Sequence, residues 1–407
     1  MNNCELMDIA CMLGVKLAES GAETYRIEES INRVVVTYGL QAQVYSVPNS
    51  LIITIIPPNS PPITQLCRIP KHTTNMEGIE RFCNIGRRIC NEKPALSVAS
   101  QWLSDSAAQQ MVYNYPTIII GNTLAAAGFC IFFGGKLNDS ICAGLCGLLL
   151  AMLSILMANL NPNVFFEKII ASFFIAMSAY TLNALGFVYS VDTVIIGPLM
   201  LLVPGLLFTN TLRDIIYGDT NAGINRFIEV LLIAAAIALG VAAAWSVSVL
   251  IYGEVDSHTA LSHIPLLTIP AGFLACYGFV IVFNVHGKGK LLCALGSAIT
   301  WAAYCLSDHL GLSGLFCCFL ATIVATVFSE WMARIRKYPA TSYLVISLLP
   351  LIPGAGIYYT AQQAVFGNAS GFISRGTDTL ATAGIMAAGI LIVTTVIKLW
   401  HKPPVAK

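Results

Sequence analysis

Charged residues are scarce in this chain of 407 residues. Asp, Glu, Lys and Arg make up 11% of it, against about 25% in soluble domains. Hydrophobic residues make up 56%, and the mean hydropathy is +0.74. This composition excludes a soluble globular protein and predicts an integral membrane protein, with the lipid bilayer as its surroundings. The net charge is +1 and no basic tract occurs, so we expect no nucleic-acid partner.

Motifs of metal sites and of hydrolases are also missing. The thirteen cysteines form no Cys-x-x-Cys pair, and eight of them lie in apolar runs, where cysteine behaves as a small hydrophobic residue. We therefore expect no metal, no cofactor and no disulfide framework. No Gly-x-Ser-x-Gly, His-Glu-x-x-His or Cys–His arrangement occurs, which argues against a membrane hydrolase and against any enzyme.

The first 112 residues differ in composition from the rest. Apolar spacing and β-branched runs predict two helices, three strands and two further helices in this stretch. These elements are expected at 3–19, 22–38, 41–47, 51–56, 63–69, 75–93 and 95–112. We interpret residues 1–112 as a small, mostly soluble α+β domain in the cytoplasm.

Ten apolar segments follow from residue 116 onward. They lie at 117–134, 139–158, 165–185, 188–208, 225–251, 264–284, 290–307, 311–333, 340–358 and 378–400. A helix needs about 20 apolar residues to cross a bilayer core about 30 Å thick. The predicted fold class is therefore a polytopic α-helical membrane protein with about ten transmembrane helices.

Two Pro-Gly dipeptides interrupt this apolar sequence at a fixed offset. Pro204-Gly205 and Pro353-Gly354 are 353 − 204 = 149 residues apart, and the same offset relates Arg226 to Arg375. An offset kept over about 25 residues indicates an internal duplication. Five spans separate equivalent positions, and because five is odd the two copies must have opposite orientations. The sequence predicts a 5+5 inverted repeat made of residues 113–255 and 256–407, an arrangement typical of secondary transporters.

The distribution of basic residues in the loops predicts the orientation. With residues 1–112 in the cytoplasm, eleven basic residues fall inside and two fall outside. Those inside are Lys168, Arg213, Arg226, Lys288, Lys290, Arg334, Arg336, Lys337, Lys398, Lys402 and Lys407, and those outside are Lys136 and Arg375. We expect a multi-pass membrane protein with both termini in the cytoplasm.

Three motifs give the chain a family resemblance. Residues 19–30 contain Ser-Gly-Ala-Glu-Thr-Tyr-Arg, residues 203–226 contain Val-Pro-Gly, Arg-Asp and Gly-Ile-Asn-Arg, and residues 349–358 contain Leu-Pro-Leu-Ile-Pro-Gly-Ala-Gly. In their order and spacing these motifs resemble the threonine/serine exporter family, with both membrane halves fused in one chain. The resemblance covers nearly the whole chain.

This resemblance implies export of amino acids across the bacterial inner membrane, driven by the proton motive force. Some relatives that are split into two polypeptides are associated with dicarboxylate export, which stays as the alternative substrate class. A channel is a further alternative, and a homo-oligomer is left open. Substrate and protons are the partners that the resemblance implies.

Each Pro-Gly pair is expected to break a helix within the bilayer. The second piece of a broken helix begins with free N–H groups and a partial positive charge, which attract a carboxylate. The other interpretation of the pairs is a kink that only aids packing. The predicted substrate-binding residues are Pro204, Gly205, Thr209, Asn210, Thr211, Pro353, Gly354, Tyr358, Tyr359 and Thr360.

Asp214 is the favoured proton site, because low dielectric favours the neutral form of a carboxyl group. Asp192 and Glu330, near span ends, are further candidates. Arg226 and Glu229, like Arg375 and Asp378, are three residues apart on a helix, so each pair is expected to form a salt bridge or a gate. The predicted coupling or gating residues are Asp214, Arg213, Asp219, Arg226, Glu229, Arg375 and Asp378.

Overall fold

The structure is a computed structural model, and it describes residues 3–70, 73–160, 163–253, 265–287, 289–336 and 338–400. The predicted boundary between the repeats, at residues 255 and 256, lies outside these ranges, as do Lys288, Lys337, Lys402, Lys407 and the C-terminus. The chain forms two compact units. Unit 1 consists of Met1–Val112, Asp214–Arg226 and Phe283–His286, and unit 2 consists of Tyr113–Arg213, Phe227–Val282 and Gly287–Lys407.

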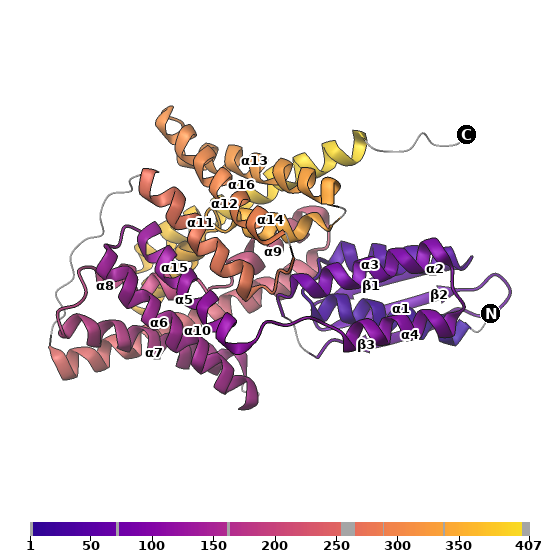
Figure 1. The fold of residues 1–407 in the computed structure, drawn as a ribbon, viewed down its shortest axis with the longest axis horizontal. Coiled ribbons are helices and arrows are strands. Elements are labelled where there is room, and N and C mark those ends of the chain that lie inside the picture. Colours follow the sequence, from indigo (N-terminus) through magenta and orange to yellow (C-terminus); the bar gives the residue numbers. More distant parts are fainter. Residues whose placement is uncertain are drawn as a thin grey trace. The chain divides into compact units, whose positions relative to one another are not determined.

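Unit 1 contains four helices and an antiparallel sheet in the order β1-β2-β3 (Figure 1). Its elements are α1 (Asn3–Glu19), α2 (Thr24–Thr37), β1 (Gln41–Val47), β2 (Ser50–Ile56), β3 (Ile63–Arg68), α3 (Met76–Glu92) and α4 (Leu96–Ala108). Leu51, Ile53 and Ile55 of β2 are fully buried. Alternate residues of a strand point to one face of its sheet, so these three give β2 an apolar face. On α1, Gly14 leaves room for the side chain of Leu51.

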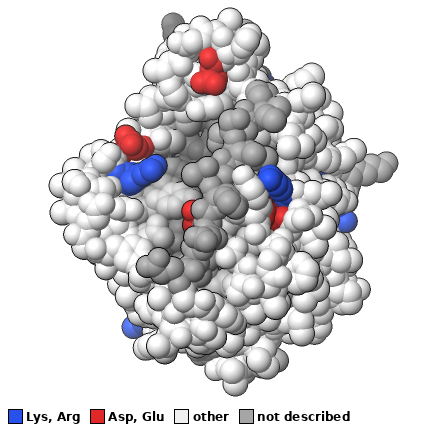
Figure 2. All heavy atoms as spheres, turned by 90° about the vertical axis from the view of Figure 1, so that its left-hand side faces the viewer, with Lys and Arg blue, Asp and Glu red and all other residues white. Residues whose placement is uncertain are grey.

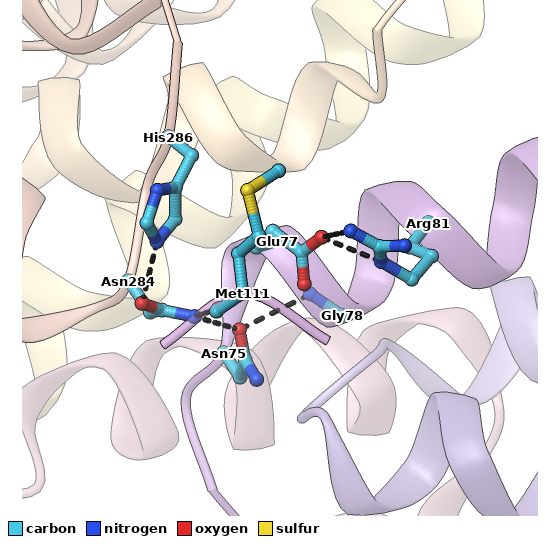
Figure 3. Close-up of polar contacts among 7 residues, drawn as sticks. All are labelled: Asn75, Glu77, Gly78, Arg81, Met111, Asn284 and His286. Atoms are coloured by element: carbon cyan, nitrogen blue, oxygen red, sulfur yellow. Dashed lines mark hydrogen bonds and ion pairs between the residues drawn. The ribbon is translucent and has the colours of Figure 1, made fainter. Parts of the chain in front are cut away.

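Residues 283–286, which connect two helices of unit 2, are fixed to the start of α3 (Figure 3). Asn75 caps α3, since its Oδ1 accepts a hydrogen bond from the Gly78 N–H at 3.1 Å. The same oxygen accepts from Nδ2 of Asn284 at 2.9 Å, and that nitrogen also donates to the Met111 carbonyl at 2.7 Å. An N-cap side chain contributes about 1 kcal/mol to helix stability. Because Asn75 Oδ1 accepts from both Gly78 and Asn284, it holds residues 283–286 against the start of α3.

Unit 2 is entirely helical in the residues that the structure describes (Figure 1). Its helices are α5 (Tyr115–Phe132), α6 (Leu137–Leu160), α7 (Val164–Ala184), α8 (Val191–Leu199), α9 (Gly205–Tyr217), α10 (Thr220–Tyr252), α11 (Pro265–Val282), α12 (Gly289–His309), α13 (Gly314–Arg336), α14 (Ala340–Leu348), α15 (Gly354–Val365) and α16 (Ala369–Trp400); the end of α9 and the start of α10 belong to unit 1.

Seven helices among the described residues are long and apolar enough to cross a membrane: α5, α6, α7, α10, α12, α13 and α16. A shorter apolar helix corresponds to α11. Figure 2 shows a face of the molecule on which most of the described surface carries no Lys, Arg, Asp or Glu side chain. The chain is thus a polytopic helical membrane protein, and the count of ten spans stays a prediction.

Helices α5 and α11 approach each other through small residues. A Cβ built on Gly128 would lie 2.6 Å from the backbone nitrogen of Ala275, and one built on Gly278 would lie 2.5 Å from that of Ala125. These contacts are reciprocal, because 275 − 125 = 278 − 128 = 150. Gly121, earlier in α5, lies against Gly278, later in α11, so the two helices run antiparallel. Small residues permit such close backbone contact between membrane helices.

A methyl group at Gly128 has no space, so Gly128→Ala is expected to lower the thermal unfolding midpoint of the full chain in detergent. Overpacking of this kind costs about 1–3 kcal/mol. Gly384→Ala on α16 is the matched control, since nothing lies within 4 Å of its added Cβ. Equal unfolding midpoints for the wild type and Gly128→Ala would show that α5 and α11 do not pack this closely.

Candidate functional site

Two helices of unit 2 are interrupted at equivalent positions. Helix α8 ends at Leu199 and α9 begins at Gly205, while α14 ends at Leu348 and α15 begins at Gly354. The ends of α8 and α14 and the starts of α9 and α15 are separated by the same number of residues, since 348 − 199 = 354 − 205 = 149. We call residues 200–204 the first break and residues 349–353 the second break. A proline ends each break, where its missing N–H and its ring prevent a continuous helix.

The two breaks touch each other. A Cβ built on Gly205 would lie 3.6 Å from the Cα of Gly354 and would overlap the side chain of Ile352. A Cβ built on Gly354 would lie 3.5 Å from Val203 and 2.9 Å from Met200. Ile352 is the repeat equivalent of Val203, since 352 − 203 = 149, so the contacts are reciprocal. The two glycines, which are among the predicted substrate-binding residues, let the two backbones lie close together.

Apolar side chains surround this contact. Phe208 on α9 and Ile357 on α15 lie in one buried cluster with Val230, Ala234 and Ala383 of α10 and α16. Phe208 and Ile357 are also repeat equivalents, because 357 − 208 = 149. Residues from both repeats therefore form a single small core next to the breaks.

The predicted threonines lie on α9 and α15, just after the breaks. The hydroxyls of Thr209, Thr211 and Thr360 each donate to the carbonyl four residues earlier, at 3.2, 2.7 and 2.7 Å. Threonine commonly bonds in this way within a helix, which leaves its oxygen able to accept a further hydrogen bond. Thr209 and Thr211 are buried, and Asn210 is half-buried.

Two neighbouring tyrosines follow the second break. The ring centroids of Tyr358 and Tyr359 are 5.2 Å apart, and the hydroxyl of Tyr358 accepts from Nε2 of Gln362 at 3.2 Å. The guanidinium carbon of Arg375, on α16, lies 5.8 Å from the centroid of the Tyr359 ring, within the range of a cation–π interaction. The structure therefore brings Tyr359 and Arg375 together.

The charged residues pair differently from the sequence prediction. Asp214, only 3% exposed, forms an ion pair with Arg226. Arg226 also donates to Thr24 Oγ1 at 3.3 Å, and all three residues belong to unit 1. The predicted pairing of Arg226 with Glu229 is therefore wrong, because Glu229 is exposed to solvent while the buried carboxylate of Asp214 needs a positive partner. Arg213, next to Asp214, is also buried.

The equivalent residues of the second repeat carry no such pair. Among the residues that the structure describes, Arg375 and Asp378 form no ion pair, although one was predicted. Gln363 occupies the position equivalent to Asp214, and its Oε1 accepts from Nδ2 of Asn368 at 2.7 Å. The charge of Arg226 is thus balanced by Asp214, whereas Arg375, at the equivalent position, has no such carboxylate partner among the described residues.

Asp219 lies in unit 1 near Glu28, an interaction that the sequence did not predict. Burial and the negative charge of Asp219 raise the pKa of Glu28, while a 3.0 Å hydrogen bond from the Ser46 N–H opposes the shift. Thr24 was also missed, because it lies 202 residues before Arg226 and no local spacing relates the two. Within the described ranges, no three His, Cys, Asp or Glu side chains gather to hold a metal ion.

Comparisons with known proteins match nearly the whole chain. Residues 8–248 match the family described as "Putative threonine/serine exporter", and residues 269–396 match the family described as "Threonine/Serine exporter, ThrE". A curated Corynebacterium glutamicum protein named "Threonine/serine exporter" is 20% identical over 419 residues, covering 98% of this chain and 84% of that relative. No solved structure matches the chain.

These descriptions agree with one another. All three name threonine/serine export, and none supports the dicarboxylate alternative. The two matched families divide the chain between them: the first covers most of α1 to most of α10, and the second covers most of α11 to most of α16. The chain belongs to the threonine/serine exporter family.

Proposed function

We propose that the protein is a secondary active exporter of threonine, serine and similar small hydroxylated amino acids, and that it exchanges substrate for protons. The contact between the two helix breaks carries this proposal, because it joins both repeats at one place. We place the protein in the bacterial inner membrane because of its family, and we place both termini in the cytoplasm because of the loop charges.

The reciprocal contacts support an inverted repeat. Gly128 on α5 and Gly278 on α11 make reciprocal contacts between helices that run antiparallel, and Gly205 and Gly354 meet at the breaks in the same reciprocal way. Equivalent helices that run antiparallel belong to repeats of opposite orientation. A transporter built in this way opens to one side and then to the other around a site between its repeats.

The breaks supply groups that suit an amino acid. An α-helix leaves the N–H groups of its first turn without acceptors inside the helix, and its N-terminus carries a partial positive charge. Helices α9 and α15 both begin where the breaks touch, so a substrate carboxylate can be held there. The oxygens of Thr209, Thr211 and Thr360 can accept a hydrogen bond from a substrate hydroxyl.

Substrate can pass this point only if Gly205 and Gly354 separate. With their backbones in contact, the breaks leave no room between them for an amino acid. We propose that opening of this contact admits substrate and that its closure completes each cycle.

Asp214 remains our proposed proton site, and its ion pair with Arg226 controls when it can take a proton. A neighbouring arginine favours the charged form of a carboxyl group, so Asp214 has to leave Arg226 before it takes a proton. Asp214 lies nine residues after Gly205 on the same helix, about 13 Å along the axis at 1.5 Å per residue. Movement of α9 would therefore couple proton binding to separation of the breaks.

Substitution at the breaks tests the proposed site. Gly205→Val and Gly354→Val should each abolish threonine efflux from proteoliposomes, because the added side chains overlap the opposite break. Gly384→Val, whose Cβ meets open space, should export normally and serves as the control. Thermal unfolding of each variant separates loss of transport from loss of fold. Wild-type efflux by both Gly205→Val and Gly354→Val would rule out the breaks as the site.

The proton gradient tests the proposed coupling. Proteoliposomes with an imposed pH gradient should move threonine against its concentration gradient and should not move succinate. Asp214→Asn cannot take up a proton, so it should still equilibrate threonine but should no longer concentrate it. Uphill transport of threonine by Asp214→Asn would show that another group carries the proton, and downhill transport alone by the wild type would indicate a channel.

A further inference from the structure

Tyr359 has both a basic and an acidic residue of unit 2 in its surroundings. The guanidinium of Arg375 lies near its ring, and the carboxylate of Asp192 interacts electrostatically with Tyr359, Tyr358 and Tyr180. Tyr180 and Tyr358 share a buried cluster with Val191, the residue before Asp192, and Tyr359 packs against that cluster. Four helices, α7, α8, α15 and α16, thus bring these groups to one place.

Both charges are available to a ligand. The side chains of Asp192 and Arg375 are exposed. In the part of the chain that the structure describes, neither residue takes part in an ion pair. An acid and a base therefore both lie near Tyr359 without pairing with each other.

Comparison of the two repeats shows how this arrangement arises. In the first repeat the charge of Arg226 is balanced by Asp214. In the second repeat Gln363 replaces that acid, so the charge of Arg375 is not balanced in the same way. The position equivalent to Asp192 is Thr341, since 341 − 192 = 149, so only the first repeat supplies an acid there. Two departures from symmetry therefore leave one acid and one base beside Tyr359.

We propose that Asp192 binds the ammonium group and Arg375 the carboxylate group of a zwitterionic amino acid beside Tyr359. This site rests on the proposed function and adds to it the residues that recognise the substrate backbone. A guanidinium can hold a carboxylate through two parallel hydrogen bonds, and the Tyr359 ring attracts an ammonium group. A dicarboxylate would place its second negative charge near Asp192, so the same pair selects against it.

Ligands that lack one charge test each half of the pair. Isothermal titration of the purified full chain would compare L-threonine, L-threonine amide, which lacks the carboxylate, and N-acetyl-L-threonine, which lacks the ammonium group. Arg375→Gln should weaken threonine binding by about tenfold or more, as expected for loss of a charge-assisted pair, and should leave the affinity for the amide unchanged. Asp192→Asn should weaken threonine binding and leave the affinity for N-acetyl-threonine unchanged.

Controls remove charges elsewhere in unit 2. Lys168→Gln, on α7, and Asp308→Asn, on α12, should bind threonine like the wild type. If Arg375→Gln or Asp192→Asn binds threonine with wild-type affinity, the proposal that these two charges bind the substrate is wrong. It is also wrong if a variant loses affinity for all three ligands equally, because that result indicates a structural role. If the wild type exports threonine in either case, the proposed function stands without this site. A wild type that neither binds nor moves threonine overturns the function as well.

Discussion

The approach of two backbones at Gly205 and Gly354 is the constraint on which the rest of unit 2 depends. A break in a membrane helix exposes N–H and C=O groups that lipid cannot satisfy, so it has to be buried against protein or face water. Here each break is buried against the other, and a side chain at either glycine would force them apart. The bounds of α8 and α9 and those of α14 and α15 place the two breaks at one offset of 149 residues.

Residues related by the 149-residue offset make the backbone contacts, and we propose that positions where the two copies differ carry the chemistry. The contacting glycines and the core residues Phe208 and Ile357 are equivalent in the two repeats. By contrast, Asp214 corresponds to Gln363 and Asp192 to Thr341. An amino acid has unlike ends, and a site with strict two-fold symmetry cannot distinguish them. We therefore expect transport to depend most on the positions where the repeats differ.

Local patterns predicted the elements well, because helix and strand periodicity, prolines and glycines act over a few residues. The strands of unit 1 and the interruptions at Pro204 and Pro353 lie where the sequence predicted them. The charged partners could not be predicted in the same way. Arg226 forms an ion pair with Asp214 on the preceding helix and a hydrogen bond with Thr24, which lies 202 residues earlier. No spacing rule relates such positions. The contact between Gly205 and Gly354 was not predicted either, since the two glycines are 354 − 205 = 149 residues apart.

The most direct test of this account asks whether the two repeats have opposite orientations. Thr220 and Ala369 are the exposed first residues of α10 and α16, and 369 − 220 = 149. Single cysteines at these positions, in a chain lacking its native cysteines, would be treated with a membrane-impermeant maleimide in intact cells and in inside-out vesicles. The account predicts that position 369 reacts only in cells and position 220 only in vesicles. Reaction of both positions from the same side would contradict it.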